Sequence, residues 1–116
     1  EISVYAKTHV AEVKEGSIRE YWLEPGDLEL RSFNFQNLKI ENSQESLELI
    51  KRVYRNESEE GKNMILINSG AAIYLSGIVD SISNGVQLAR DALASGAAMA
   101  KLREFCKFTQ RFESQG

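Results

Sequence analysis

Reactive side chains are scarce in this sequence. Its 116 residues include one cysteine, Cys106, and one histidine, His9. A single cysteine excludes an intrachain disulfide and a cysteine metal cluster, and a single histidine excludes a histidine-rich metal site and argues against a hidden catalytic triad. We therefore expect Cys106 to be a small apolar core residue of the last helix. We expect His9 to be an exposed or partly covered strand residue.

Positive charge and long apolar runs are scarce as well. The 14 Lys and Arg residues are outnumbered by 17 Asp and Glu, which gives a formal net charge of −3 and an isoelectric point near 5.2. This balance lacks the basic footprint of a nucleic-acid-binding domain, and no apolar run approaches the ~20 residues of a membrane span. The opening residues, Glu1 to Val4, lack the basic start of a secretory leader. We expect a cytoplasmic protein, or a plastid protein if the source is a plant, with neither nucleic acid nor membrane as a partner.

The residues that are present suffice for one domain with a core of its own, since 42% of them are hydrophobic. Residues 8–23 predict a β-hairpin, because two β-branched and aromatic segments flank a polar turn at 14–17. The alternation places Val13, together with Tyr21 or Trp22, on faces that can be buried. Trp22 could cover the core or lie at an interface, and we expect it to cover the core.

The second half of the chain, residues 42–110, predicts four helices. A turn at Pro25 ends the hairpin, and the segment 28–40 is expected to be extended. The first helix begins at Asn42, whose side chain can accept hydrogen bonds from first-turn amides, and Glu45 stands three residues later in the capping-box position.

Small residues and caps mark the remaining helices. A polar loop over 56–61 leads to an almost entirely apolar stretch, 64–78, whose length and small residues favour a buried helix that Gly77 ends. A third helix starts at Ser81 or Ser83. The last helix frays after Gln110 and carries an apolar face: Met99, Leu102, Phe105, Cys106 and Phe108.

No motif supplies an active site by itself. A glycine-rich phosphate loop is absent, because the glycines are scattered through the helical half and suit caps and close packing. The hairpin carboxylates Glu12, Glu15 and Glu20 are expected to be surface residues rather than acid/base pairs. The residues alone therefore predict an α/β domain without a self-sufficient active site.

Several motifs, in order along the chain, resemble anthranilate phosphoribosyltransferase. The run Asn68-Ser69-Gly70-Ala71-Ala72-Ile73-Tyr74-Leu75-Ser76-Gly77 is similar to the family's Asn, small residues, Leu-Tyr and Gly. Gly85 to Ala89 and Ala94 to Leu102 resemble the two helix starts that follow. Upstream, Thr8 to Val13 resembles a Pro-Thr-x-Val-x-Glu strand, and Pro25 to Leu30 resembles a Pro-Glu-Asp-Phe-Gly-Leu turn, although Ala6-Lys7 stands where the family has Gly-Pro.

The resemblance implies a fold, an activity and a metal. Residues 1–116 would form the C-terminal part of an incomplete nucleoside-phosphorylase/phosphoribosyltransferase-type α/β domain, seen as a β-hairpin followed by about four α-helices. The family transfers phosphoribose from phosphoribosyl pyrophosphate to anthranilate, a step of tryptophan biosynthesis. Glu1 matches the second acid of an Asp-Glu pair that helps to hold Mg²⁺ on the phosphoribosyl pyrophosphate, and the preceding Asp is missing from this sequence.

The same resemblance leaves this chain without a catalytic or substrate-binding residue of its own. The family's pyrophosphate loop, its anthranilate contacts and its dimer interface belong upstream, so the expected partners are the rest of its own polypeptide and a second copy in a homodimer. We expect the isolated chain to be inactive. Two alternatives are a pyrimidine-nucleoside phosphorylase or a nucleic-acid-binding relative of the same fold, and a stand-alone structural or interaction module.

Overall fold

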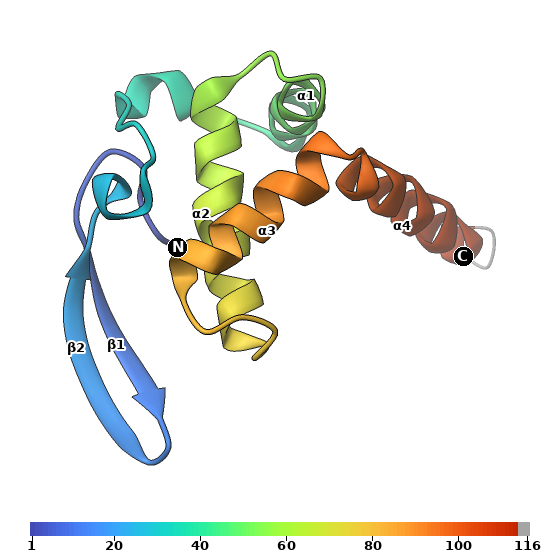
Figure 1. Ribbon diagram of the computed structural model, residues 1–116. Coiled ribbons are helices and arrows are strands. Elements are labelled where there is room, and N and C mark those ends of the chain that lie inside the picture. The colour runs from blue at the N-terminus through green and yellow to red at the C-terminus, as the bar shows by residue number, and fades with distance from the viewer. Residues whose placement is uncertain (114–116) are drawn as a thin grey trace.

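A computed structural model describes residues 1–113 of the chain. Over these residues a two-stranded hairpin is followed by four α-helices, as predicted (Figure 1). The hairpin and the helical body are connected by a segment with two short 3₁₀ turns, which the sequence did not indicate. The elements are β1 (Thr8–Lys14), β2 (Ser17–Leu23), η1 (Pro25–Leu28), η2 (Phe35–Leu38), α1 (Ser43–Tyr54), α2 (Glu59–Leu75), α3 (Ile82–Ala94) and α4 (Ala97–Glu113).

The two strands of the hairpin are antiparallel, with Thr8 opposite Leu23 and Lys14 opposite Ser17. Glu15 and Gly16 both have positive φ, 51° and 79°, which gives the tight turn whose twist suits a two-residue hairpin loop.

The burial of the hairpin differs from the prediction at Val13 and Trp22, whereas Tyr21, the other aromatic residue named, is half-buried against the core. Trp22 is 64% exposed and Val13 is 72% exposed. The reason is the strand period of two: Leu23 is buried in the core, so its neighbour Trp22 must face outward. Val13 faces outward in the same way, because its neighbour Glu12 is turned toward the helices.

Helix α1 begins where its cap predicts. The Asn42 side chain accepts a hydrogen bond from the Glu45 amide at 2.9 Å, and the Glu45 carboxylate accepts one from the Glu41 amide at 2.9 Å.

Helix α2 begins at Glu59, five residues before the predicted apolar start at Met64. Ser58 is buried and accepts a hydrogen bond from the Gly61 amide at 3.2 Å, which caps the first turn. The helix ends at Leu75, and Gly77 then adopts a φ of +80°, the left-handed conformation expected after a helix end.

Helices α2 and α3 cross at a close backbone contact. A Cβ placed on Gly85 would lie 2.1 Å from the Gly70 carbonyl oxygen, and one placed on Gly70 would lie 2.6 Å from the Val86 nitrogen. The Ser81 side chain caps α3 by accepting from the Asn84 amide at 3.1 Å, so Ser81 and not Ser83 starts this helix. The core forms around this crossing and includes Val4, Leu23, Leu28, Leu30, Leu66, Ile67, Val86 and Ala89.

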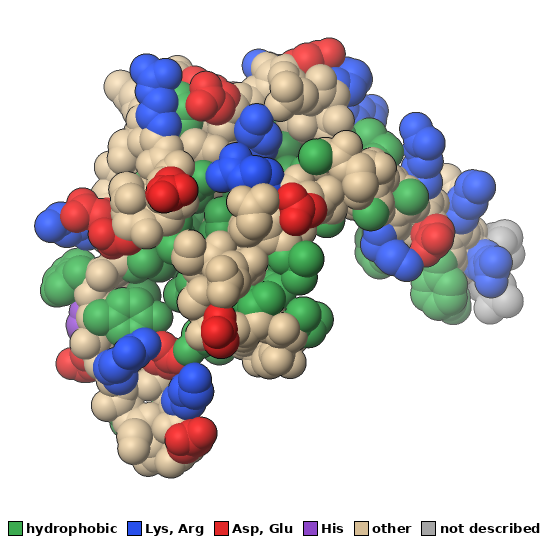
Figure 2. All heavy atoms as spheres, viewed as in Figure 1, with side chains coloured by type: hydrophobic (Ala, Val, Ile, Leu, Met, Phe, Trp, Pro, Cys, Tyr) green, Lys and Arg blue, Asp and Glu red, His purple; other side chains and the backbone are tan. Residues whose placement is uncertain are grey.

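Helix α4 extends away from the body (Figure 1). Its aromatic residues Phe105, Phe108 and Phe112 are exposed, and hydrophobic side chains gather along one side of it in Figure 2. Cys106 is also exposed, contrary to the prediction, as are all the residues from 103 to 113 of α4.

The last helix is also longer than predicted. It continues past Gln110 to Glu113, and the rest of the predicted frayed tail lies outside the described residues. Within residues 1–113, no helix combines the length and the apolar character that crossing a membrane requires.

Candidate functional site

The hairpin and α2 lie across a cavity of about 680 Å³. It is lined by the N-terminal residues, strand β1, Tyr21 of β2, the last two turns of α2 and Ile82 of α3. Small side chains on α2, such as Ala71 and Ala72, leave the space open. The polar residues that line it are Glu1, Thr8, His9, Glu12, Tyr21, Asn68 and Tyr74.

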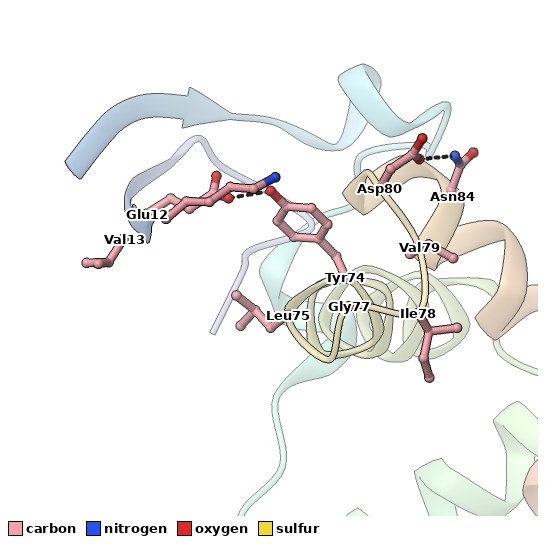
Figure 3. Close-up of a pocket in the computed structure, with 10 residues that line it drawn as sticks. Glu12, Val13, Tyr74, Leu75, Gly77, Ile78, Val79, Asp80 and Asn84 are labelled. Atoms are coloured by element: carbon pink, nitrogen blue, oxygen red, sulfur yellow. Dashed lines mark hydrogen bonds between the residues drawn. The ribbon is translucent and has the colours of Figure 1, made fainter. Parts of the chain in front are cut away.

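Glu12 is the buried charge of this cavity. Its side chain is 8% exposed, and Arg19 donates to its Oε2 at 3.1 Å. Tyr21 donates to the same oxygen at 3.3 Å, and the Tyr74 hydroxyl donates to Oε1. Figure 3 shows Glu12 and Tyr74 pointing toward one another across the gap between β1 and α2. The prediction that Glu12 is a surface residue is therefore wrong.

These donors decide the charge state of Glu12. The hydrogen bond from Tyr74 is the largest influence and lowers the pKa of the Glu12 carboxyl; Arg19 lowers it further, while burial acts in the opposite direction. Conversely, the hydrogen bond to Glu12 raises the pKa of Tyr74. At neutral pH the pair is an ionised carboxylate and a neutral phenol, which suits a fixed tether between hairpin and helix and does not suit a general acid.

A second cavity, of about 760 Å³, is also lined by Tyr74 and adjoins the turn after α2. The turn after α2 forms its rim, where the Asn84 side chain donates to Asp80 at 2.7 Å (Figure 3). Glu12, Val13, Tyr74 and Leu75 line both cavities. The Lys14 ammonium lies 5.8 Å from the centre of the Tyr74 ring, within the range of a cation–π contact.

Glu1, the predicted metal ligand, lies at the first cavity and is exposed. Among residues 1–113, no three His, Cys, Asp or Glu side chains come together in a way that could hold a metal ion. Mg²⁺, however, keeps several waters and is bound by one or two carboxylates together with substrate phosphates. A single carboxylate at the edge of a cavity fits one ligand of such a site and does not make a complete site.

His9 is an exposed strand residue, as predicted, on the outer face of the hairpin, where its ring lies 4.9 Å from that of Trp22. His9 is also among the residues that line the first cavity, although it stands on the opposite face of β1 from Glu12.

Sequence reasoning missed the groups that surround Glu12 and the part played by Asn68. The signal for the first was the register: Val10 pairs with Tyr21 and Glu12 with Arg19, so these four share one face. The contact with Tyr74 had no such signal, because it joins residues 62 positions apart.

Comparison of this sequence with known proteins shows its family. Residues 1–99 match the family described as "Glycosyl transferase family, a/b domain", and the chain belongs to this family. The match includes Glu1, Glu12, Asn68 and Tyr74.

Three curated relatives that match almost the whole chain carry the same name. The chain is 43% identical over 119 residues to an anthranilate phosphoribosyltransferase from Stutzerimonas stutzeri (strain A1501), in a match that covers 99% of this chain and 34% of that protein. It is 40% identical to the enzyme of that name from Leptothrix cholodnii, covering 98% and 33%, and 43% identical to that from Cellvibrio japonicus, covering 95% and 33%. The family resemblance seen in the sequence is thereby confirmed, and the chain spans about a third of the length of these relatives.

Proposed function

We propose that the whole protein to which this chain belongs transfers phosphoribose from phosphoribosyl pyrophosphate to anthranilate. In this reaction the anthranilate nitrogen forms a bond to the anomeric carbon, the bond from that carbon to the pyrophosphate oxygen breaks, and the amine loses a proton. The observation that carries the proposal is the 43% identity over 99% of this chain to a relative of that name. The same observation favours a phosphoribosyltransferase over a nucleoside phosphorylase, a nucleic-acid-binding relative or a stand-alone module.

We further propose that Glu1 supplies one carboxylate ligand to Mg²⁺ in the whole protein. The support is its place at the first cavity and the preference of Mg²⁺ for few carboxylates together with phosphate oxygens. When bound, the ion would neutralise charge on the departing pyrophosphate. The second acid and the substrate contacts would come from outside this chain.

The share of this chain in the reaction is to build one wall of the site. The Glu12–Tyr74 contact joins β1 to α2 and so sets the width of the cavity. Its own residues provide a scaffold and one acid, so we expect the 116-residue chain alone to consume no anthranilate.

The test is an assay of the whole protein with anthranilate, phosphoribosyl pyrophosphate and Mg²⁺. The loss of anthranilate fluorescence and the release of pyrophosphate are the two signals measured. We expect both signals from the whole protein and neither from the isolated chain. Phosphate-dependent cleavage of a pyrimidine nucleoside, with no consumption of anthranilate, would favour the phosphorylase instead.

The assembly of the whole protein is part of the same proposal. We expect a homodimer located in the cytoplasm, or in the plastid if the source is a plant. Light scattering on the purified whole protein measures the first, and fluorescent tagging in the source cell measures the second.

A further inference from the structure

The side chain of Asn68 forms hydrogen bonds with both main-chain groups of Ile2, the amide and the carbonyl. The Ile2 amide donates to Asn68 Oδ1 at 2.8 Å, and Asn68 Nδ2 donates to the Ile2 carbonyl at 3.0 Å. The same Nδ2 also donates to the Met64 carbonyl, one turn earlier on α2, at 3.0 Å. The amide group therefore has one orientation, fixed by the helix, and presents to Ile2 the donor and acceptor that a neighbouring strand would present.

The residues after Ile2 are held at two further points. The Ser3 amide donates to Thr8 Oγ1 at 3.1 Å. The Val4 side chain is fully buried, and its carbonyl accepts from the Phe33 amide at 3.2 Å. Of these contacts, the pair made by Asn68 lies nearest to Glu1, and both residues line the same cavity.

We propose that Asn68 is a positioning residue for the carboxylate of Glu1. It makes no bond to substrate in this role; it fixes the adjoining peptide, so that the acid is presented at the cavity with little freedom to move away. The inference rests on the proposed function, in which Glu1 is a metal ligand. Groups that orient a ligand in this way are commonly worth about 10–100-fold in metal affinity or activity.

The experiment compares two asparagine-to-leucine variants of the whole protein. Asn68→Leu keeps the approximate side-chain size and removes the hydrogen bonds that the Asn68 side chain makes to Ile2 and Met64. Asn63→Leu is the matched control: it lies on the same helix, is buried, and donates to the Arg31 carbonyl at 3.2 Å, so its loss disturbs α2 without touching Ile2.

Two measurements distinguish positioning from a general loss of stability. Electron paramagnetic resonance measures the affinity for Mn²⁺, as a probe for Mg²⁺, in the presence of phosphoribosyl pyrophosphate, and NMR measures hydrogen exchange at the Ile2 amide. We expect Asn68→Leu to bind Mn²⁺ at least about tenfold more weakly and to exchange the Ile2 amide rapidly. Asn63→Leu should leave both unchanged even where its melting temperature falls.

A second variant covers the case in which Asn68→Leu does not fold. Asn68→Ala removes the same hydrogen bonds with a smaller side chain that suits a helix, so its loss of Mn²⁺ affinity should be in the same direction.

Equal Mn²⁺ affinity in the wild type and in a folded Asn68 variant would overturn the inference, and so would an equal loss in the Asn63 control. The proposed function fails by a different result, namely no transfer of phosphoribose to anthranilate by the wild-type protein. Rapid exchange at Ile2 together with weakened Mn²⁺ binding in Asn68→Leu would support positioning even then.

Discussion

Among single residues, Glu12 is held most firmly by other side chains. A carboxylate is stable away from water only when hydrogen-bond donors and a compensating charge replace its hydration. Tyr74, Tyr21 and Arg19 supply both, from two different elements. The cluster therefore stabilises the position of the hairpin on α2 only while Glu12 is ionised.

The first prediction concerns the pH dependence of stability. The pKa of Glu12 is lowered in the folded chain, so the unfolded chain takes up a proton first as the pH falls. The stabilisation is fully present above the unfolded carboxyl pKa of ~4.3 and is lost as the pH falls through the lower folded value. Urea denaturation of the dilute chain, repeated from pH 7 downward, should show the free energy of unfolding decreasing below this unfolded pKa. In Glu12→Gln the decrease should be less steep.

Glu48 provides the control for this measurement. Its pKa is also lowered, by Lys51 at 2.8 Å, but this pair is exposed. Salt screens exposed pairs, so in high salt Glu48→Gln should follow the wild-type curve while Glu12→Gln departs from it. An acid slope that is identical in Glu12→Gln and the wild type would contradict this account of the cluster.

At the scale of elements, the crossing of α2 and α3 depends on two residues without side chains. Gly85 approaches the backbone of Gly70 so closely that an added methyl group would meet a carbonyl oxygen at 2.1 Å. A backbone oxygen within a helix cannot move by itself, so the two helices would have to separate.

The second prediction is that Gly85→Ala lowers the free energy of unfolding by about 3 kcal/mol, the upper part of the usual cost of overpacking. Gly26→Ala is the control, because it has open space around it and no left-handed φ, and we expect a change within about 0.5 kcal/mol. Thermal denaturation monitored by circular dichroism measures both. Equal melting temperatures for the two variants would show that the helices can adjust without cost.

Element types and caps were predictable from the sequence, whereas starts and faces that depend on distant contacts were not. Asn42 and Gly77 marked helix ends correctly because capping is local chemistry. The start of α2 was misplaced because Glu59, Glu60 and Gly61 have the composition of a loop, yet a buried Ser58 caps them. Within the candidate site, Glu1 was found through resemblance, while the roles of Glu12 and Asn68 depend on partners more than 60 positions away.

At the scale of the whole molecule, two apolar surfaces have no cover within the described residues. One is the outer face of the hairpin, with Val13, Ile18 and Trp22, and the other is the aromatic side of α4. Apolar patches of this kind are typical of surfaces that contact other protein. The chain spans about a third of the length of its relatives, so the rest of the whole protein is available to cover them.

The third prediction is that the 116-residue chain self-associates. Size-exclusion chromatography with light scattering should give a mass that rises with concentration, and Trp22→Ser should lower it, since Trp22 is 64% exposed. Gln44→Ser, an exposed polar change on α1, should not. A monomer at all concentrations would show that the exposed faces are tolerated in water.

The hydrogen bonds between Asn68 and Ile2 also set an order of events during synthesis. They join residues separated by 66 positions, and at ~5–20 residues per second the ribosome needs on the order of 3–13 seconds to supply the second partner after the first. Throughout that interval the peptide beside Glu1 has no partner on α2. The wall of the cavity is therefore completed late, after the hairpin has been made. A translational pause between the two would lengthen the time for which the segment around Ile2 is open to proteases.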